Sequence, residues 1–192
     1  MKESILQERI ILGVDPGTSV MGYGIIKVVQ NKLSLLNYGV ITLSKYDNHA
    51  KRLQVIVNRI DSIIEEYKPD ELAIEAPFYG KNVQSMLKLG RAQGAVLGCA
   101  LRKDIPCAEF APKRIKQSIC GNGNASKEQV AGMVMKLLSI KEQPKFLDAT
   151  DALGAAVCLY FQNSQAGNNF ASSTGSYGSW KDFVSKNPKR KK

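Results

Sequence analysis

The sequence has little histidine and no paired cysteines, and each shortage excludes a class of chemistry. His49, expected at the start of a helix, is the only histidine in 192 residues, so a Ser–His or Cys–His catalytic pair is not expected. The four cysteines, at positions 99, 107, 120 and 158, contain no Cys-x-x-Cys spacing, which argues against a zinc site. We therefore expect buried, reduced thiols.

Long apolar runs are also missing. No stretch approaches the roughly 20 consecutive apolar residues that span a bilayer. The first residues lack the basic region and apolar core that mark a secretory signal. From these absences we expect a cytoplasmic protein that does not associate with membranes.

Positive charge is in excess. Lys and Arg number 27 against 17 Asp and Glu, which gives a formal net charge of +10. This excess favours a polyanionic partner, although some basic proteins are merely soluble. The length and the 44% hydrophobic composition fit one domain with a sizeable core.

Hydrophobic periodicity predicts an α/β fold over residues 1–162. The predicted strands are 9–15, 22–30, 33–43, 71–77 and 105–110, with a hairpin turn at 31–32. The predicted helices are 49–67, 82–103, 113–120, 127–139 and 147–162, the fourth opened by a capping box of Ser126 and Gln129. Three consecutive strands followed by alternating helices and strands predict a mixed five-stranded sheet with helices packed on both sides.

Two further segments stand out by composition. Gly90, Gly94 and Gly98 share one face of the predicted helix 82–103, and since glycine weakens helices we interpret them as a close contact with another backbone, within the chain or across a dimer. Residues 163–192 are rich in Asn, Ser and Gly and hold six Lys/Arg against one acid, half of the net charge. We predict that they form a disordered basic tail.

Four carboxylates have positions that suggest a shared site. Asp15 and Glu75 each end a short apolar strand, and if the two strands are parallel neighbours, their carboxyl ends meet where α/β sheets bind ligands. Asp148 and Asp151 share a face at the start of the last helix. Each acid alone is explained as a turn, ion-pair or helix-start residue. Together they favour Mg²⁺, and two such ions about 3.5–4 Å apart can promote phosphodiester cleavage.

Five motifs, in order along the chain, carry a resemblance to a known family. They are ILGVDPGTSVMGYG, AIEAPFYGKN, SMLKLGRAQG, RIKQSICGNGNASKEQV and DATDALGAA. Together they resemble the RuvC family of Holliday junction resolvases, which have a ribonuclease-H-like fold, over about residues 9–162. The resemblance implies a homodimeric endonuclease that nicks opposed strands of a four-way DNA junction symmetrically. It also implies two Mg²⁺ ions per site, for which Mn²⁺ can substitute, and work with the RuvA–RuvB branch-migration complex in recombination and repair.

The resemblance also implies roles for individual residues. The implied catalytic and metal-binding residues are Asp15, Glu75, Asp148 and Asp151, and the implied DNA-binding residues are Phe78, Lys116 and Lys127. An aromatic ring beside the site could stack on an unpaired base, worth about 1–3 kcal/mol, but Phe78 alone is better explained as a core or turn residue. A lone lysine is usually a solvated surface residue. RAQG at 91–94 reverses the family's usual Gln-Ala-Arg order, so we assign no DNA contact to Arg91.

Other functions remain open from the sequence. One is a ribonuclease-H-like nuclease for structured RNA, of the pre-16S ribosomal RNA processing type, since no motif identifies a reader of the 2′-OH. Another is an actin-like phosphotransferase, whose phosphate loop resembles DPGTS at 15–19, although such enzymes need a second loop and a second domain. A catalytically inactive DNA-binding module is the third, but it would have no use for four acids that repel phosphate.

Overall fold

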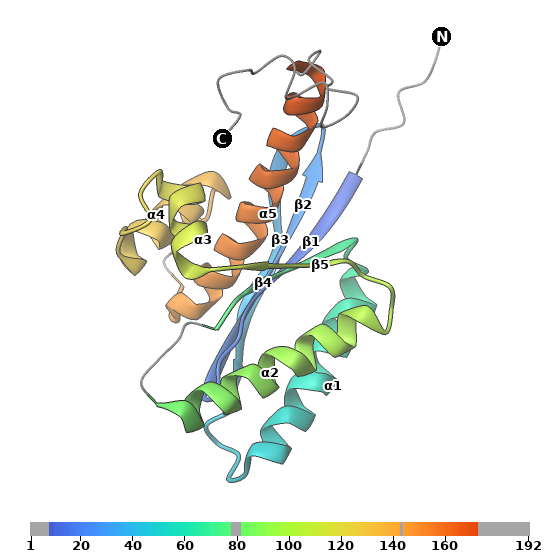
Figure 1. Ribbon diagram of the computed structural model, residues 1–192, viewed down its shortest axis with the longest axis vertical. Helices are drawn as coiled ribbons and strands as arrows, with labels where there is room; N and C mark the ends of the chain where they lie inside the picture. The colour runs from blue at the N-terminus through green and yellow to red at the C-terminus, as the bar shows by residue number, and fades with distance from the viewer. Residues whose placement is uncertain (1–7, 78–81, 143, 173–192) are drawn as a thin grey trace, which may run out of the picture. The chain divides into compact units, whose positions relative to one another are not determined.

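The computed structural model describes residues 8–77, 82–142 and 144–172. Residues 1–161 form one compact unit and residues 162–192 a second. The first unit contains a single sheet with helices on both faces (Figure 1). Among the described residues, no helix has both the length and the apolar character needed to cross a bilayer.

The sheet has five strands in the order β3-β2-β1-β4-β5. The strands are β1 (Glu8–Asp15), β2 (Val20–Val29), β3 (Lys32–Thr42), β4 (Glu71–Glu75) and β5 (Cys107–Phe110). The first three pair antiparallel, whereas β1, β4 and β5 run parallel. The predicted mixed five-stranded sheet is therefore confirmed.

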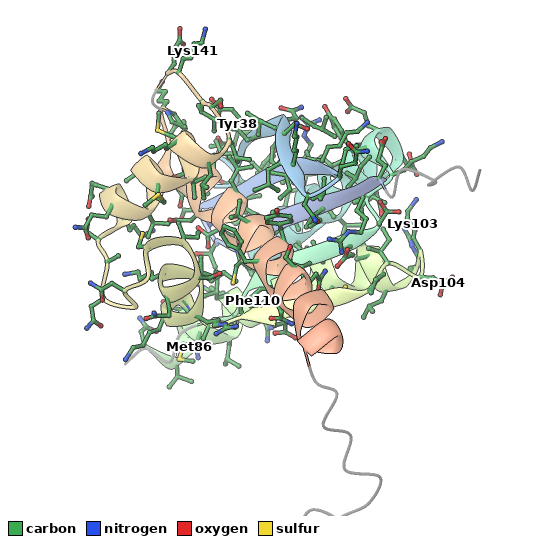
Figure 2. All side chains as sticks on the ribbon, turned by 90° about the horizontal axis from the view of Figure 1, so that it is seen from above. Tyr38, Met86, Lys103, Asp104, Phe110 and Lys141 are labelled. Atoms are coloured by element: carbon green, nitrogen blue, oxygen red, sulfur yellow. The ribbon has the colours of Figure 1, made fainter. Side chains whose placement is uncertain are left out.

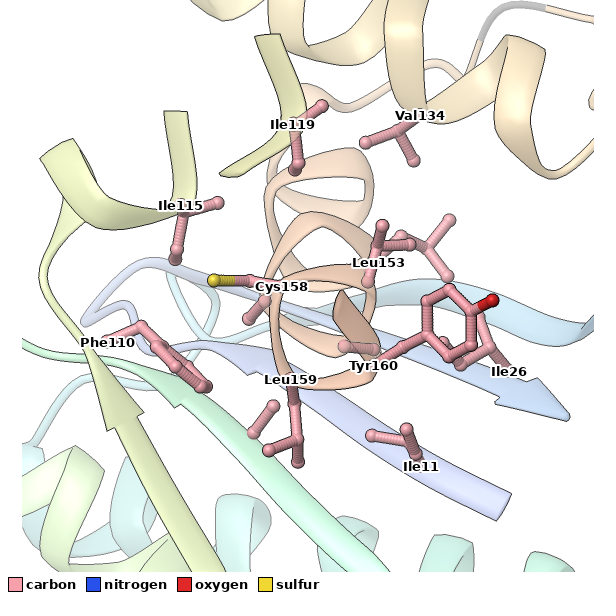
Figure 3. Packing of buried hydrophobic residues seen from close by; sticks show 14 of the residues in the cluster. Ile11, Ile26, Phe110, Ile115, Ile119, Val134, Leu153, Cys158, Leu159 and Tyr160 are labelled. Atoms are coloured by element: carbon pink, nitrogen blue, oxygen red, sulfur yellow. The ribbon is translucent and has the colours of Figure 1, made fainter. Parts of the chain in front are cut away.

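Five helices cover the two faces of this sheet. They are α1 (His49–Tyr67), α2 (Val83–Leu101), α3 (Pro112–Cys120), α4 (Lys127–Leu137) and α5 (Leu147–Ser172). One buried cluster joins α1 and α2 to one face, and a second joins α3, α4 and the buried part of α5 to the other (Figure 3). Charged side chains such as Lys103, Asp104 and Lys141 point outward (Figure 2).

Alternation along β1 assigns its residues to the two faces. Leu12 and Val14 belong to the cluster under α1 and α2, whereas Ile11 belongs to the cluster under α5. Successive side chains of a strand point to opposite faces. The side chain of Asp15 therefore points to the α5 face, and so would a Cβ added at Gly13.

Several local predictions are confirmed and others need correction. Helix α1 begins at His49, and Ser126 and Gln129 form the predicted capping box. The hairpin turn lies one residue earlier than predicted, at Gln30 and Asn31, both of which have positive φ as tight hairpin turns require. Of the four free cysteines, those at 99 and 158 are buried and those at 107 and 120 are only partly so.

The last helix is longer than predicted. Its expected end was near 162, but α5 continues to Ser172. The change to Asn, Ser and Gly removes the apolar periodicity, yet residues 163–172 contain no proline to interrupt the helical hydrogen bonds. The division into a domain over 1–162 and a basic tail over 163–192 stays a prediction, and residues 173–192 lie outside the described part.

The glycine stripe of α2 has no close neighbour among the residues that the structure describes. A Cβ added at Gly90, Gly94 or Gly98 would meet nothing within 4 Å. The interpretation of close packing within the chain is therefore wrong, because this face of α2 is open rather than turned toward the core. The alternative of a contact across a dimer is not affected.

Close packing by glycine occurs instead between the sheet and α5. A Cβ at Gly13 would lie 2.0 Å from the carbonyl oxygen of Ala152, and one at Gly22 would lie 1.9 Å from that of Asp148. At Gly24 the nearest atom would belong to the Leu153 side chain, at 2.5 Å. The missing side chains allow the backbone of α5 to lie directly on β1 and β2.

Gly22→Ala is expected to destabilise the protein by about 1–3 kcal/mol. Its methyl group would clash with the backbone of Asp148, which cannot move aside as a flexible side chain could. Gly132→Ala on α4 is the matched control, since a Cβ there meets nothing within 4 Å. That variant should gain about 0.5–1 kcal/mol from improved helix propensity. Urea unfolding of both variants checks the prediction, and equal stability would contradict the close contact.

Candidate active site

Asp15 and Glu75 lie side by side at one edge of the sheet. The parallel strands β1 and β4 pair Val14 with Ile74, so the next residue of each strand is the acid. Ile74 belongs to the cluster under α1 and α2 and Ala73 to the other cluster, which places Glu75 on the α5 face. Both acids therefore share a face as well as an edge.

Asp148 and Asp151 arrive at the same place from the first turns of α5. Asp151 is only 9% exposed, and the backbone of Asp148 rests against Gly22. Gly22 is also the strand partner of Asp15. The contact that brings α5 onto the sheet thus delivers its two acids to the end of β1.

Burial and mutual repulsion raise the pKa of two of these carboxyls. Burial is the largest cause at Asp15, and the charges of Glu75, Asp151 and Asp148 add to it, so that its pKa rises to about 8. The pKa of Glu75 rises to about 7, mainly through burial and then through Asp151. Such shifts mean that the fold holds negative charge where it is poorly solvated, and a nearby cation would offset it.

Two lysines supply part of that positive charge. The Lys127 ammonium donates a hydrogen bond to Asp151 Oδ2 at 2.7 Å, and this bond raises the pKa of Lys127. Its charge also lowers the pKa of Asp15 and of Glu75. Lys116 on α3 lowers the pKa of Glu75 as well. Both lysines that the resemblance singled out therefore border the acids.

The connection between α3 and α4 fixes the approach of these lysines. Gln117 Nε2 donates to the carbonyl oxygen of Gly121 at 2.8 Å, and its Oε1 accepts from the Gly123 amide at 3.0 Å. Gly121, at φ 68°, ends α3 in the left-handed conformation that favours glycine. Ser126 then caps α4 directly before Lys127. Both helices are thus held at their connected ends.

Phe78 lies outside the described residues, so its placement is not tested. Arg91 is exposed on α2, on the other side of the sheet from the acids.

The donor chemistry of the site fits a hard divalent cation. Its four potential ligands are all carboxylates, the oxygen donors that Mg²⁺ prefers. The raised pKa values of Asp15 and Glu75 show that a nearby positive charge would be favourable there. Over the described ranges, however, no three His, Cys, Asp or Glu side chains are arranged to hold a metal ion as they stand. Lys127 engages one oxygen of Asp151, so binding an ion requires the side chains to close around it.

Sequence reasoning missed two features of the site. It did not use Gly13, Gly22 and Gly24, although glycine inside a strand signals close approach by another backbone. It also assigned Lys127 to DNA without its ion pair to Asp151. No signal in the sequence could have revealed that pair, because it depends on how α4 and α5 are placed.

Comparison with known proteins agrees with this arrangement. The family model described as crossover junction endodeoxyribonuclease RuvC matches residues 11–159. The chain belongs to the RuvC family. The RuvC protein of Porphyromonas gingivalis is 58% identical over 184 residues, covering 95% of this chain and 96% of the relative. The RuvC protein of Cytophaga hutchinsonii is 57% identical over 185 residues, covering 96% and 89%.

A solved RuvC structure also matches the fold. Thermus thermophilus RuvC in complex with a Holliday junction substrate superposes with a TM-score of 0.77 at 30% identity, covering 82% of this chain and 96% of that one. The ribonuclease-H-like fold expected from the motifs is thereby confirmed. Membership of the RuvC family does not favour the RNA-processing nuclease or the actin-like phosphotransferase.

The raised pKa of Asp15 makes the stability of the metal-free protein depend on pH. Because the folded state binds the proton more tightly than the unfolded chain, the stabilisation is complete below about pH 4 and is lost as the pH rises through about 8. Asp15→Asn removes the ionisation, so its melting temperature should exceed that of the wild type increasingly from pH 5 to pH 8. Each 1 kcal/mol corresponds to about 2–4 °C.

Thermal melts in EDTA across this pH range measure the difference. Asp104→Asn, a change at an exposed carboxylate away from the site, is the control and should follow the wild-type profile. Parallel profiles for Asp15→Asn and the wild type would contradict the buried charge.

Proposed function

We propose that this protein is an endonuclease that resolves four-way DNA junctions by metal-assisted hydrolysis of phosphodiester bonds. The observation that carries the proposal is the convergence of acids from β1, β4 and α5 at one sheet edge, bordered by two lysines, in a member of the RuvC family. The relatives' name, crossover junction endodeoxyribonuclease, supports the reaction. The T. thermophilus relative in complex with a Holliday junction supports the substrate.

The four acids are the proposed metal ligands. Asp15, Glu75, Asp148 and Asp151 would hold two Mg²⁺ ions, or Mn²⁺ in their place, which when bound activate a water molecule and stabilise the leaving oxygen. The pKa values of Asp15 and Glu75 are raised to about 8 and about 7, so a bound cation would favour their ionised forms and would lower both values. Lys127 pairs with Asp151 in the absence of metal, and Asp151 would exchange this partner for the cation when it serves as a ligand.

The positive groups around the acids are the proposed DNA contacts. Lys116 and Lys127 would bind phosphates that flank the cut, and their charge attracts a polyanion to an acidic pocket that would otherwise repel it. Phe78 follows Glu75 by three residues, and we propose that it stacks on an unpaired base at the junction. The +10 net charge of the chain supports the same partner.

Symmetric cutting of two opposed strands calls for two sites related by twofold symmetry, which a homodimer provides. The open face of α2 supports such a contact, since its exposed apolar residues include Val83 and Leu87 and its glycine stripe has free space above it. Small side chains allow two helices to approach closely. We place this homodimer in the cytoplasm with the DNA that it cuts, acting with a RuvA–RuvB branch-migration complex.

Glu75→Gln and Asp148→Asn should each reduce junction cleavage about 100-fold or more. Loss of a metal ligand removes several kcal/mol of transition-state stabilisation, at about 1.4 kcal/mol per tenfold in rate. Junction binding in EDTA should survive or improve, because each change removes a charge that repels phosphate. Asp104→Asn, which has the same change of charge outside the site, should cut at the wild-type rate.

The cleavage assay compares a synthetic four-way junction, a linear duplex and a structured RNA, each with and without Mg²⁺. Preference for the junction supports the proposal. Faster cutting of the RNA would favour the RNA-processing alternative, and wild-type rates in both acid variants would place the active site elsewhere.

Leu87→Glu should convert the proposed dimer to a monomer, because it introduces a charge on the exposed apolar face of α2. Leu137→Glu is the matched control on α4, where another exposed leucine lies away from α2. Light scattering on the eluting protein measures the mass of each variant. A Leu87→Glu variant that stays dimeric, or a Leu137→Glu variant that becomes monomeric, would exclude α2 as the dimer face.

A further inference from the structure

Arg52 of α1 connects two loops through its guanidinium group. Its Nη1 donates a hydrogen bond to the carbonyl oxygen of Thr18 at 2.8 Å, and its Nε donates to that of Tyr46 at 2.9 Å. Thr18 lies in the turn that follows Asp15, and Tyr46 lies between β3 and α1. One partly buried side chain thus joins the turn after the first acid to the start of α1.

The same turn is held by backbone contacts that leave little room for adjustment. The carbonyl oxygen of Ser19 accepts from the amides of Leu43 and Ser44 at 2.8 and 3.0 Å. A Cβ at Gly17 would lie 1.6 Å from the carbonyl oxygen of Val20. The turn is therefore packed against the backbone, and Arg52 is the side chain that fastens it to a helix.

Arg52 belongs to the opposite face of the sheet from the acids. It projects from α1, whose buried residues pack on Leu12 and Val14, whereas Asp15 points to the α5 side. The cation that lowers the pKa of Asp15 is Lys127, while the charge of Arg52 acts on His49 in its own helix. The contact of Arg52 that lies nearest to Asp15 in the chain is its hydrogen bond to Thr18 in the turn.

We infer that Arg52 is a positioning residue for Asp15, because its hydrogen bond to Thr18 ties the turn that begins at this acid to α1, while its second bond, to Tyr46, fixes the guanidinium group in place. The inference rests on the proposed function, in which Asp15 is a metal ligand. Groups that orient metal ligands change metal affinity or activity by about 10–100-fold when they are removed. Displacements of about 1 Å in an active site have effects of a similar size.

Three variants separate positioning from charge. Arg52→Met removes both hydrogen bonds and the charge, whereas Arg52→Lys keeps the charge but cannot reproduce the planar fork that reaches both carbonyl oxygens. Lys51→Met is the matched control, since it removes one charge from the neighbouring residue, whose ammonium donates a hydrogen bond to the nearby Gln54 side chain. Calorimetric titration with Mn²⁺ in the absence of DNA measures metal affinity, alongside junction affinity in EDTA and the single-turnover cleavage rate.

We expect Arg52→Met and Arg52→Lys to weaken Mn²⁺ binding about tenfold and to slow cleavage by at least the same factor. Junction affinity in EDTA should stay within about twofold of that of Lys51→Met, which itself should bind Mn²⁺ and cut like the wild type. A purely structural role would lower the melting temperature without changing Mn²⁺ affinity. If Arg52→Met does not fold, Arg52→Lys decides the question.

Recovery of full metal affinity and cleavage in Arg52→Lys would overturn the inference, because charge would then suffice. Weaker Mn²⁺ binding in Lys51→Met would also overturn the inference, because loss of a positive charge on α1 would then explain the effect. Failure of the proposed function looks different: the wild type itself would cut no junction, or would bind Mn²⁺ no better than Glu75→Gln. Wild-type enzyme that binds and cuts, beside Arg52 variants that do the same, refutes the role of Arg52 alone.

Discussion

The contact between α5 and the middle of the sheet determines where the active-site charges lie. Gly13 and Gly22 have no side chains, which leaves space for the α5 backbone. The first turns of that helix therefore contact the backbone of β1 and β2 directly. At this short separation the charges of Asp148 and Asp151 act on Asp15 and raise its pKa. The apolar remainder of α5 then covers the same face and stabilises the contact by burying its side chains.

The same contact brings negatively charged side chains close together, which is unfavourable for the folded state. Carboxylates gathered at a partly buried sheet edge repel one another, and the raised pKa values of Asp15 and Glu75 express that repulsion together with their burial. Lys127 reduces this repulsion in part, because its ammonium pairs with the Asp151 carboxylate. A site of this kind gives up some stability in the free protein and gains affinity for a divalent cation, because the ion replaces repulsion with attraction.

Much of this arrangement follows from local patterns in the sequence. Asp15 and Glu75 could be predicted as neighbours, since each ends an apolar run and parallel strands bring their carboxyl ends to one edge. Helix α1 could be predicted to the residue, from the periodicity of its isoleucines and from Pro69 beyond its end. These features depend on residues that are close together in the chain.

Features that depend on the packing of distant segments could not be predicted in this way. The pairing of Lys127 with Asp151 requires α4 and α5 to be placed relative to each other, and no periodicity encodes that placement. The stripe of Gly90, Gly94 and Gly98 predicted close packing, but a helix pattern does not say whether its neighbour is the same chain or another. The end of α5 was misplaced because loss of apolar periodicity marks the end of burial and not the end of the hydrogen-bonded helix.

The two faces of the sheet contribute differently to the surroundings of Asp15. The face of α3, α4 and α5 supplies the charges, through helices whose ends carry acids and lysines. The face of α1 and α2 carries Arg52, which holds the carbonyl oxygen of Thr18 in the turn after Asp15. A carboxylate at the end of a strand is held by the ladder on its N-terminal side alone. Its position therefore depends also on what holds the turn beyond it, so under the proposed function a ligand on one face of the sheet would rely on an anchor on the other.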